Sequence, residues 1–334
     1  MNNRAYVLAT RPQALPNAQN WRVVDEPVHE PADGEVLLKT LYLSIDPAMR
    51  GWMDDRPSYL PPVGTGEVMR ALGVGEVIAS KHRNFEPGDY VSGMPGVQTF
   101  ACVDGNTLTK IDPELAPLPK YTSVLGMTGM TAYFGLFEIG EAKSGDTVVI
   151  SAASGAVGSV AGQLAKIAGS RTVGIAGGPE KCAYVRDELG FDVAIDYRNE
   201  NVYAALRTHC PNGINVYFDN VGGEILDACL GNLAMHARVV ICGAISQYNA
   251  EDVRGPSNYM MLLIKRARME GFLVSDYYAE YGKAAREMAA WLREGKLHSH
   301  EDIVEGIDRF PETLLRLFTG EHLGKLVIEV AKPS

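Results

Sequence analysis

The strongest constraint on the fold of this 334-residue chain is an alternation that runs from about residue 145 to residue 295. Short runs rich in Val and Ile alternate there with longer amphipathic stretches. Nearly continuous apolar runs are typical of strands that are covered on both faces. The expected strands are 147–151, 171–176, 192–196, 214–219, 237–243 and 270–274. The expected helices are 158–169, 179–190, 199–209 and 222–234. Strands that alternate with helices predict right-handed βαβ units and an α/β fold with a doubly wound parallel sheet.

The first of these runs also raises the question of a membrane span. From Thr147 to Ala165 there are 19 residues without a charge, close to the length that a spanning helix needs. The run contains three Gly, three Ser, a Thr and a Gln, and neither a Lys/Arg asymmetry nor an aromatic belt frames it. The mean hydropathy of the chain is -0.06. We therefore expect a soluble protein in which this run is a strand, a glycine turn and a helix.

The region before residue 120 has a different pattern. Short strands are expected at 34–45, 73–80, 88–93 and 99–111, punctuated by Gly, Pro and Asp turns. This pattern predicts an antiparallel β domain, such as a partly open barrel. After about residue 298 the chain has one expected helix and a final strand at 325–330, which we expect to return to the first domain. The expected domains are 1–122 with 299–334, and 123–298.

Charge and cysteine content narrow the class of protein. The net charge of -10 disfavours a protein that coats phosphate backbones, so no nucleic-acid or membrane partner is expected. The N-terminus lacks the apolar core of a signal peptide. The five cysteines are odd in number and form no CxxC pair, which is typical of free thiols in a reducing compartment. A cytoplasmic location is expected.

The glycine turn after the first expected strand is a candidate phosphate site. Gly155 and Gly158 let the turn stay tight and let a ligand approach the backbone, while the N–H groups of the next helix favour an anion. A pyrophosphate fits such a turn. The first glycine of the usual G-x-G-x-x-G is Ala153 here, and the alternative is close helix–sheet packing without a ligand. The repeated βα pattern favours a dinucleotide.

The end of the second expected strand indicates which dinucleotide. An NAD site usually has an acidic residue there for the ribose 2′-OH. This chain has Gly177 and Gly178 instead, with Lys181 just beyond. The lysine can pair with a 2′-phosphate, although a solvated lysine at a helix start is the alternative. The missing carboxylate favours NADPH.

Several segments resemble a known family. They are 43–51 (LSIDPAMRG), 152–159 (AASGAVGS), 217–224 (YFDNVGGE), 242–249 (CGAISQYN), 268–272 (RMEGF) and 323–325 (LGK). Together they are similar to the zinc-independent medium-chain dehydrogenases/reductases. Within these, the nearest group is the leukotriene B4 12-hydroxydehydrogenase/prostaglandin reductases, with plant alkenal double-bond reductases and bacterial curcumin reductase-like enzymes. The resemblance implies a GroES-like β domain, a Rossmann domain and a homodimer. It also implies NADPH-dependent reduction of the carbon–carbon double bond of α,β-unsaturated ketones and aldehydes.

The same resemblance implies site residues. At the pyrophosphate and the 2′-phosphate these are Gly155, Ala156, Val157, Gly158, Lys181 and Tyr197. Along the nicotinamide half they are Thr128, Asn220, Cys242, Gly243, Ala244, Ile245, Ser246, Tyr248, Phe272, Leu273 and Val274, and His322 is a further cofactor contact. On the substrate side they are Ala48, Met49, Arg50 and Tyr248.

Two positions depart from the family pattern. Ala48 stands where relatives often carry a Tyr that lines the substrate pocket, so we expect a wider pocket mouth. His322 stands where relatives commonly carry Asn, although an imidazole can still donate a hydrogen bond.

Zinc catalysis is not expected from the residues. Zinc-dependent alcohol dehydrogenases supply Cys and His ligands around a GHE stretch and a four-cysteine lobe, whereas this chain reads GTGEVMRALGVGEV at 64–77. Cys102 is the only cysteine among the first 181 residues. His82, His298 and His300 show no ligand spacing.

Reduction of an enone places negative charge on the carbonyl oxygen, so the protein must orient the cofactor and supply a donor to that oxygen. Tyr248 is the candidate for this contact or for proton delivery, because it follows the fifth expected strand at its carboxyl end. The alternative is that Tyr248 packs against the nicotinamide ribose. The alternative functions are a quinone reductase of the zeta-crystallin-like branch and a non-catalytic NADPH-binding protein.

Overall fold

The computed structural model describes residues 1–250 and 252–334, and it divides into two compact units. The first unit consists of Met1–Gly126 and Glu301–Ser334, and the second consists of Met127–His300. The domain boundaries expected at 122/123 and 298/299 lie within a few residues of these. In the described residues, no helix is both long and apolar enough to cross a membrane.

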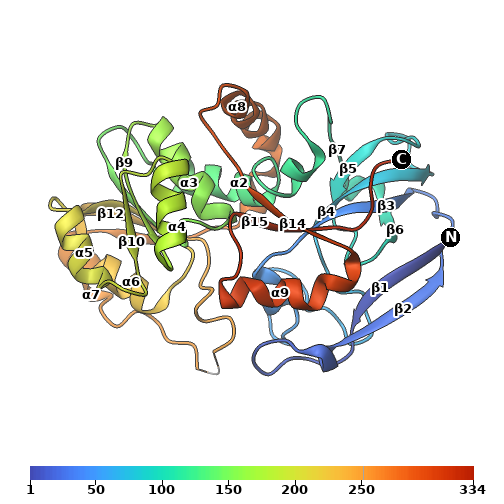
Figure 1. Cartoon of the computed structure of the whole chain (residues 1–334), viewed down its shortest axis with the longest axis horizontal. Coiled ribbons are helices and arrows are strands. Elements are labelled where there is room, and N and C mark those ends of the chain that lie inside the picture. Colours follow the sequence, from blue (N-terminus) through green and yellow to red (C-terminus); the bar gives the residue numbers. More distant parts are fainter. Residues whose placement is uncertain (251) are drawn as a thin grey trace. The chain divides into compact units, whose positions relative to one another are not determined.

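The second unit is built on a parallel sheet, of which β9, β10 and β12 are labelled in Figure 1, and its strand order is β10-β9-β8-β11-β12-β13. Its strands are β8 (Thr147–Ser151), β9 (Arg171–Ala176), β10 (Val193–Asp196), β11 (Ile214–Asp219), β12 (Leu233–Ile241) and β13 (Arg268–Gly271). The order reverses between β8 and β11, since β9 and β10 lie on one side of β8 and the later strands on the other. Such a reversal is where doubly wound sheets bind ligands.

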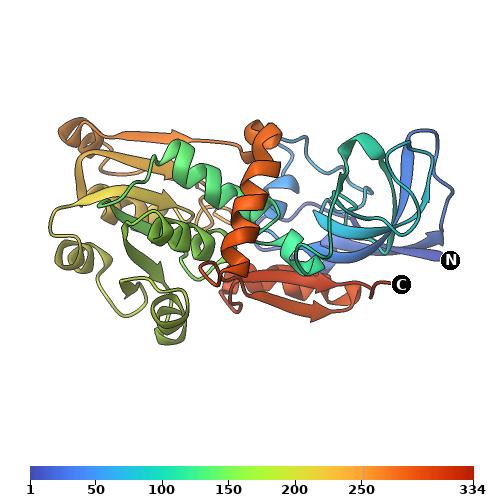
Figure 2. The same ribbon diagram turned by 90° about the horizontal axis from the view of Figure 1, so that it is seen from above.

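Four helices connect these strands as the alternation predicts: α3 (Ala156–Ile167), α4 (Pro179–Ala183), α5 (Val202–His209) and α6 (Gly223–Leu230). A further helix, α7 (Met260–Lys265), was not expected. The unit also contains α2 (Met127–Phe134) and α8 (Tyr281–Arg293), the long orange helix in Figure 2. α4 continues into a π-helical turn at Tyr184–Glu188. The buried side chains of β8, β9 and β11, among them Val149, Val173 and Tyr217, form the core under α5 and α6.

Several expected boundaries in this unit were wrong, most clearly at the last two strands. The last strand ends at Gly271 rather than at residue 274, because Phe272 turns its ring toward Gly135 instead of continuing the ladder. The strand expected at 237–243 is β12, which begins earlier, at Leu233. The helix expected at 222–234 is correspondingly shorter, since α6 ends at Leu230 and residues 233 and 234 belong to the strand. β12 bends within its length, since His236 has a φ of 60° and the pairing with β11 shifts register.

The first unit is mostly antiparallel. Its main sheet has the order β14-β15-β3-β4-β5-β7. In addition, β6 pairs with residues 35–39 of β3, on the edge that does not face β4. The bounds are β3 (Glu35–Ser44), β4 (Gly73–Ser80), β5 (Tyr90–Gly93), β6 (Phe100–Asp104), β7 (Thr109–Lys110), β14 (Glu301–Glu305) and β15 (Lys325–Glu329). A separate hairpin pairs β1 (Asn2–Leu8) with β2 (Trp21–Pro27). β14 was not expected, because its sequence EDIVE is largely charged; it pairs in parallel with β15.

Two helices complete the first unit, α1 (Ala48–Trp52) and α9 (Phe310–Thr319). α9 packs its apolar face, including Phe310 and Leu314, into a core with Leu43 and Ile328. The ends of β3 and β15 are joined by a buried ion pair in which Lys325 Nζ lies 2.8 Å from Asp46 Oδ1. Burial lowers the pKa of Lys325, and Asp46 raises it. This pair anchors the chain just before α1.

Candidate functional site

The turn between β8 and α3 has the geometry of an anion site. Gly155 is the N-cap of α3 and has no side chain to cap the helix, so the N–H groups of the first turn face outward. A Cβ on Gly158 would lie 2.3 Å from the carbonyl oxygen of Ala152. Glycine at 158 is therefore required for the close approach of helix and turn, whereas a Cβ on Gly155 would lie 3.2 Å from the same oxygen. These residues fit a pyrophosphate on the helix N-terminus.

The reversal of strand order places a buried polar group beside this turn. Ser151 at the end of β8 donates from Oγ to Asp219 Oδ1 over 3.2 Å. Asn220, which follows β11, donates from Nδ2 to the Ser151 carbonyl oxygen over 2.8 Å and from its backbone N–H to Ser151 Oγ over 2.9 Å. Asn220 is thus held at the carboxyl ends of β8 and β11, where the dinucleotide was expected.

The segment after β12 is held against the same strand end. The backbone N–H groups of Cys242 and Gly243 donate to the Asp219 carbonyl oxygen over 2.9 and 3.1 Å. Tyr248 Oη accepts from the Ala244 N–H over 3.3 Å, and a Cβ on Gly243 would lie 2.9 Å from that hydroxyl. The loop from 242 to 248 is therefore folded back on itself, with Tyr248 over its start.

Cys242 is not a reactive thiol in this setting. Burial, together with the nearby Asp219, raises the pKa of Cys242 to about 12. The thiol stays protonated at neutral pH, and only the thiolate is a strong nucleophile.

Two other expected nicotinamide contacts are positioned by packing. A Cβ on Gly135 would lie 2.6 Å from the tip of the Phe272 ring, so the absence of that atom makes room for Phe272 beside Phe218. Phe272 is thereby anchored, while Leu273 is 39 % exposed. Thr128 is buried near the start of α2.

The carboxyl ends of β9 and β10 form a second, more open polar group. A Cβ on Gly177 would lie 2.8 Å from the Tyr197 ring, which is 46 % exposed. Arg198 lies near Gly178, with its guanidinium 3.9 Å from the position that a Cβ would take there. Burial and the Arg198 charge both lower the pKa of Lys181, while Glu180 raises it.

Arg198 is therefore a candidate that sequence reasoning missed. Its place directly after Tyr197 was the only available signal. Two cations that raise each other's electrostatic energy beside a glycine turn fit an anionic group such as a 2′-phosphate.

Four expected residues belong to the first unit. Ala48 and Met49 lie at the start of α1, with Met49 fully buried. The Arg50 guanidinium is buried, donates to the Ala14 carbonyl oxygen and pairs with Asp54 at 2.6 Å. His322 Nδ1 lies 3.1 Å from the Arg316 carbonyl oxygen, so this nitrogen carries a proton and donates.

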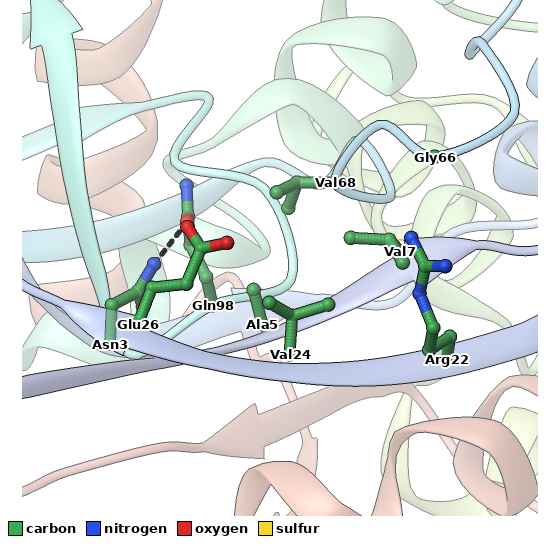
Figure 3. A pocket seen from close by; sticks show the side chains of 9 residues that line it. All are labelled: Asn3, Ala5, Val7, Arg22, Val24, Glu26, Gly66, Val68 and Gln98. Atoms are coloured by element: carbon green, nitrogen blue, oxygen red, sulfur yellow. Dashed lines mark hydrogen bonds between the residues drawn. The ribbon is translucent and has the colours of Figure 1, made fainter.

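A cavity of about 360 Å³ is also present in the first unit, beside the β1–β2 hairpin (Figure 3). Val7, Val24 and Val68 line it, and Asn3 donates to Gln98 at one end over 2.7 Å. It contains none of the expected site residues.

Comparison with known proteins decides the family. A family profile described as "N-terminal domain of oxidoreductase" matches residues 4–111, and one described as "Zinc-binding dehydrogenase" matches residues 156–290. The chain is 42% identical over 335 residues to the NADPH-dependent curcumin reductase of Escherichia coli, with 98% of this chain and 97% of that protein covered. The chain belongs to the zinc-independent medium-chain reductases.

Other medium-chain reductases agree with this assignment. The 2-alkenal reductase (NADP(+)-dependent) of Nicotiana tabacum is 43% identical over 301 residues, which cover 89% of this chain and 88% of that protein. Among solved structures, CurA from Vibrio vulnificus in complex with NADPH is 43% identical, has a TM-score of 0.94, and is covered over 99% of this chain and 100% of that chain. The Rossmann-type parallel sheet and the barrel-like N-terminal domain are those of this family, which confirms the expected fold.

The second family profile is named for zinc binding, but this medium-chain reductase lacks a matching set of metal ligands among its described residues. Among residues 1–250 and 252–334, no three His, Cys, Asp or Glu side chains lie close enough together to hold a metal ion. Zinc does not fit the residues present, and we assign it no part in the reaction.

Proposed function

We propose that this chain reduces the carbon–carbon double bond of α,β-unsaturated ketones and aldehydes, with NADPH as the reductant. The observation that carries the proposal is the polar group at the strand reversal, in a chain whose relatives include an NADPH-dependent curcumin reductase and a 2-alkenal reductase. NADPH, when bound, supplies a hydride to the β-carbon of the substrate. The electron pair of the double bond then moves toward the carbonyl oxygen, and a proton must reach the α-carbon.

In this proposal the chain contributes a donor and a rigid frame. Tyr248 donates its hydroxyl proton toward the carbonyl oxygen of the substrate or delivers it to the α-carbon, while the Ala244 N–H holds Oη. Asn220, the loop from 242 to 246, Thr128 and the segment 272–274 orient the nicotinamide end. Packing on the nicotinamide ribose stays the alternative role for Tyr248.

At the other end of the site, Lys181, Tyr197 and Arg198 are proposed to hold the 2′-phosphate. The support is their position around Gly177 and Gly178, together with the electrostatic coupling of Lys181 and Arg198. The first turn of α3, from Gly155 to Gly158, would hold the pyrophosphate. His322, Met49 and Arg50 keep their proposed roles near the cofactor and the substrate, and Ala48 is proposed to contact the substrate.

The function is tested by measuring NADPH oxidation with alkenals, alkenones, a diarylheptanoid and quinones. We expect turnover with the enones, and product analysis should find the saturated carbonyl compound. Turnover confined to quinones, or an allylic alcohol as the product, would contradict the proposal. Tight NADPH binding without any turnover would indicate a binding protein.

We also propose that the chain forms a homodimer through the edge of its parallel sheet. β13 ends the strand order, and all four of its residues are exposed, unlike the residues of β10 at the opposite edge. Next to β13, α7 exposes Met260, Leu263 and Ile264 by 49%, 69% and 61%. An exposed strand edge beside apolar side chains is suited to two-fold pairing with a second copy.

Sedimentation velocity tests the dimer. Leu263→Asp combined with Ile264→Asp should shift the chain to a monomer, whereas Val23→Asp, on the exposed strand β2, should not. A wild-type monomer at micromolar concentration would refute this proposal.

We propose a cytosolic location as well, supported by five cysteines that are all free thiols.

A further inference from the structure

Two buried carboxylates end two strands of the parallel sheet on either side of the strand reversal. Asp196 is the last residue of β10 and is 9% exposed, and Asp219 is the last residue of β11 and is 1% exposed. Neither is among the residues expected to contact the cofactor. Buried carboxylates are costly unless they are hydrogen-bonded, so the bonds that each makes show what it holds.

Asp219 organises the turn that follows β11. Its Oδ1 accepts from the Tyr217 hydroxyl over 2.7 Å and from the N–H groups of Val221 and Gly222 over 3.0 and 2.9 Å. Gly222 has a φ of 71°, a conformation that glycine adopts readily and a residue with a Cβ does not. Burial raises the pKa of Asp219, and these hydrogen bonds lower it.

Asp219 and the turn that it stabilises also make hydrogen bonds to the ends of the neighbouring strands. Ser151 of β8 also donates to Asp219 Oδ1, and the Asp219 carbonyl oxygen accepts from Cys242 and Gly243 after β12. The Val221 carbonyl oxygen accepts from the backbone N–H of Ser246 over 3.2 Å and from its hydroxyl over 2.6 Å. One residue therefore joins three segments that belong to the nicotinamide end.

Asp196 does the same for the other end. Its Oδ1 accepts from the Gly178 N–H over 2.7 Å and from the Arg198 N–H over 3.0 Å, and its Oδ2 accepts from Asn199 Nδ2 over 2.8 Å. Gly178 has a φ of 95°. Burial alone would raise the pKa of Asp196, but the hydrogen bonds outweigh it, so the pKa is lowered. The carboxylate thus links the end of β9 to the chain that carries Tyr197 and Arg198.

We propose that Asp219 is the positioning residue of the nicotinamide end and Asp196 that of the 2′-phosphate end, and that each acts on its own end alone. This division rests on the proposed function. It separates the alignment of the reacting atoms from the choice between NADPH and NADH, and assigns each to one carboxylate.

The two carboxylates are distinguished by the isosteric variants Asp219→Asn and Asp196→Asn, with Asp192→Asn as the matched control. Asp192 precedes β10 at its opposite end and also accepts from a backbone N–H, that of Thr172, over 2.8 Å. Calorimetry with NADPH, NADH and 2′-phospho-ADP-ribose, which lacks the nicotinamide, measures each end without turnover.

For Asp196→Asn we expect NADPH and 2′-phospho-ADP-ribose to bind about fivefold more weakly, with NADH nearly unchanged. The direction of the change in NADPH affinity is decisive. A carboxylate that acted only through its charge would repel the 2′-phosphate, so its neutralisation would tighten NADPH binding. Tighter or unchanged NADPH binding would overturn the assignment of Asp196.

For Asp219→Asn we expect NADPH and NADH to weaken alike and 2′-phospho-ADP-ribose to bind as it does to the unaltered protein. Hydride transfer should slow about tenfold. The kinetic isotope effect with NADPH deuterated at the transferred position should therefore rise, and in Asp196→Asn it should stay at the wild-type value.

The control guards against a merely structural explanation. Asp192→Asn should lower the melting temperature and leave the ligand ratios and the isotope effect unchanged. If Asp219→Asn behaves like Asp192→Asn, Asp219 only supports the fold and the proposal fails.

If Asp219→Asn does not fold, Tyr217→Phe removes one donor to the same carboxylate and should move the same ratios in the same direction. Ligand ratios unchanged in Tyr217→Phe would also contradict the proposal. A wild-type protein that binds NADPH without reducing enones would refute the proposed function, while the ligand ratios would still decide this division.

Discussion

The two ends of the proposed cofactor site differ in how their polar groups meet water. At the reversal between β8 and β11, Ser151 and Asp219 are 0% and 1% exposed and bond to each other. At the ends of β9 and β10, Tyr197 is 46% exposed and Arg198 is exposed as well. A buried network keeps fixed distances, whereas exposed charges attract over longer range and are screened by salt. The first arrangement suits alignment of reacting atoms, and the second suits recognition of a charged group.

The largest effect that tests this contrast is expected at Tyr248. Tyr248→Phe removes a donor to developing charge and should lower kcat/KM for an enone about 10- to 100-fold, or about 1.4–2.7 kcal/mol. The loss should be the same with NADPH and NADH, since it belongs to the nicotinamide end. Tyr203→Phe, a change at an exposed ring, serves as the control. An unchanged rate would leave Tyr248 with its packing role.

A smaller effect, confined to one cofactor, is expected at Lys181. Lys181→Ala should weaken NADPH binding about tenfold, because a charge-assisted contact with phosphate contributes about 1–3 kcal/mol. NADH has no 2′-phosphate and should bind nearly as before. Lys166→Ala, at the far end of α3, is the control. Equal weakening of both cofactors in a binding titration would show that Lys181 supports the fold or the adenosine generally.

The substrate side should respond by a few-fold change in preference. Ala48→Tyr restores the ring that relatives often carry and should shift kcat/KM about threefold to tenfold toward small or linear enones. Ala48→Ser adds a hydroxyl without a ring and should shift it less. Rates measured with a small alkenone and a bulky diarylheptanoid give the ratio. Identical profiles for the three proteins would mean that position 48 does not contact the substrate.

The smallest expected effect is that of salt on cofactor preference. Raising the ionic strength from about 0.01 to 0.15 M shortens the screening length from about 30 to 8 Å, so the NADPH-to-NADH affinity ratio should fall about two- to threefold. The isotope effect on hydride transfer should not change with salt, because Ser151 and Asp219, which hold the nicotinamide end in place, are buried. A preference that resists salt would mean that the 2′-phosphate end is closed to solvent in the complex.

Much of the second unit could be predicted because its signals are local. The expected strands at 147–151, 171–176 and 214–219 match β8, β9 and β11 residue for residue, since continuous apolar runs mark buried strands. For the same reason the predicted glycines lie at the junction of β8 and α3, with Gly155 as the N-cap and Gly158 in the first turn of the helix. Prediction was poorer where packing between distant residues decides the ends. Phe272 leaves the sheet because Gly135, far away in the sequence, makes room for its ring.

The first unit was harder to predict. The charged strand β14 has no apolar periodicity, and it forms because its backbone pairs in parallel with β15. Arg50 illustrates the same difficulty for the site, because nothing local indicates that its guanidinium donates to the carbonyl oxygen of Ala14. Arg198 was missed because its nearness to Gly178 depends on β10 lying beside β9.

The sequence by itself determined the α/β class, the strand–turn–helix that suits a pyrophosphate, and the family, through motifs that are contiguous in the chain. Only the tertiary structure decided which groups hold those motifs in place. Asp196 reaches Gly178 across 18 residues, and Ser151 reaches Asp219 across 68. Their contacts follow from the strand order β10-β9-β8-β11, which aligns the carboxyl ends of strands that are remote in sequence. Periodicity reports which face of an element is buried, whereas the partner of a buried carboxylate depends on which elements become neighbours.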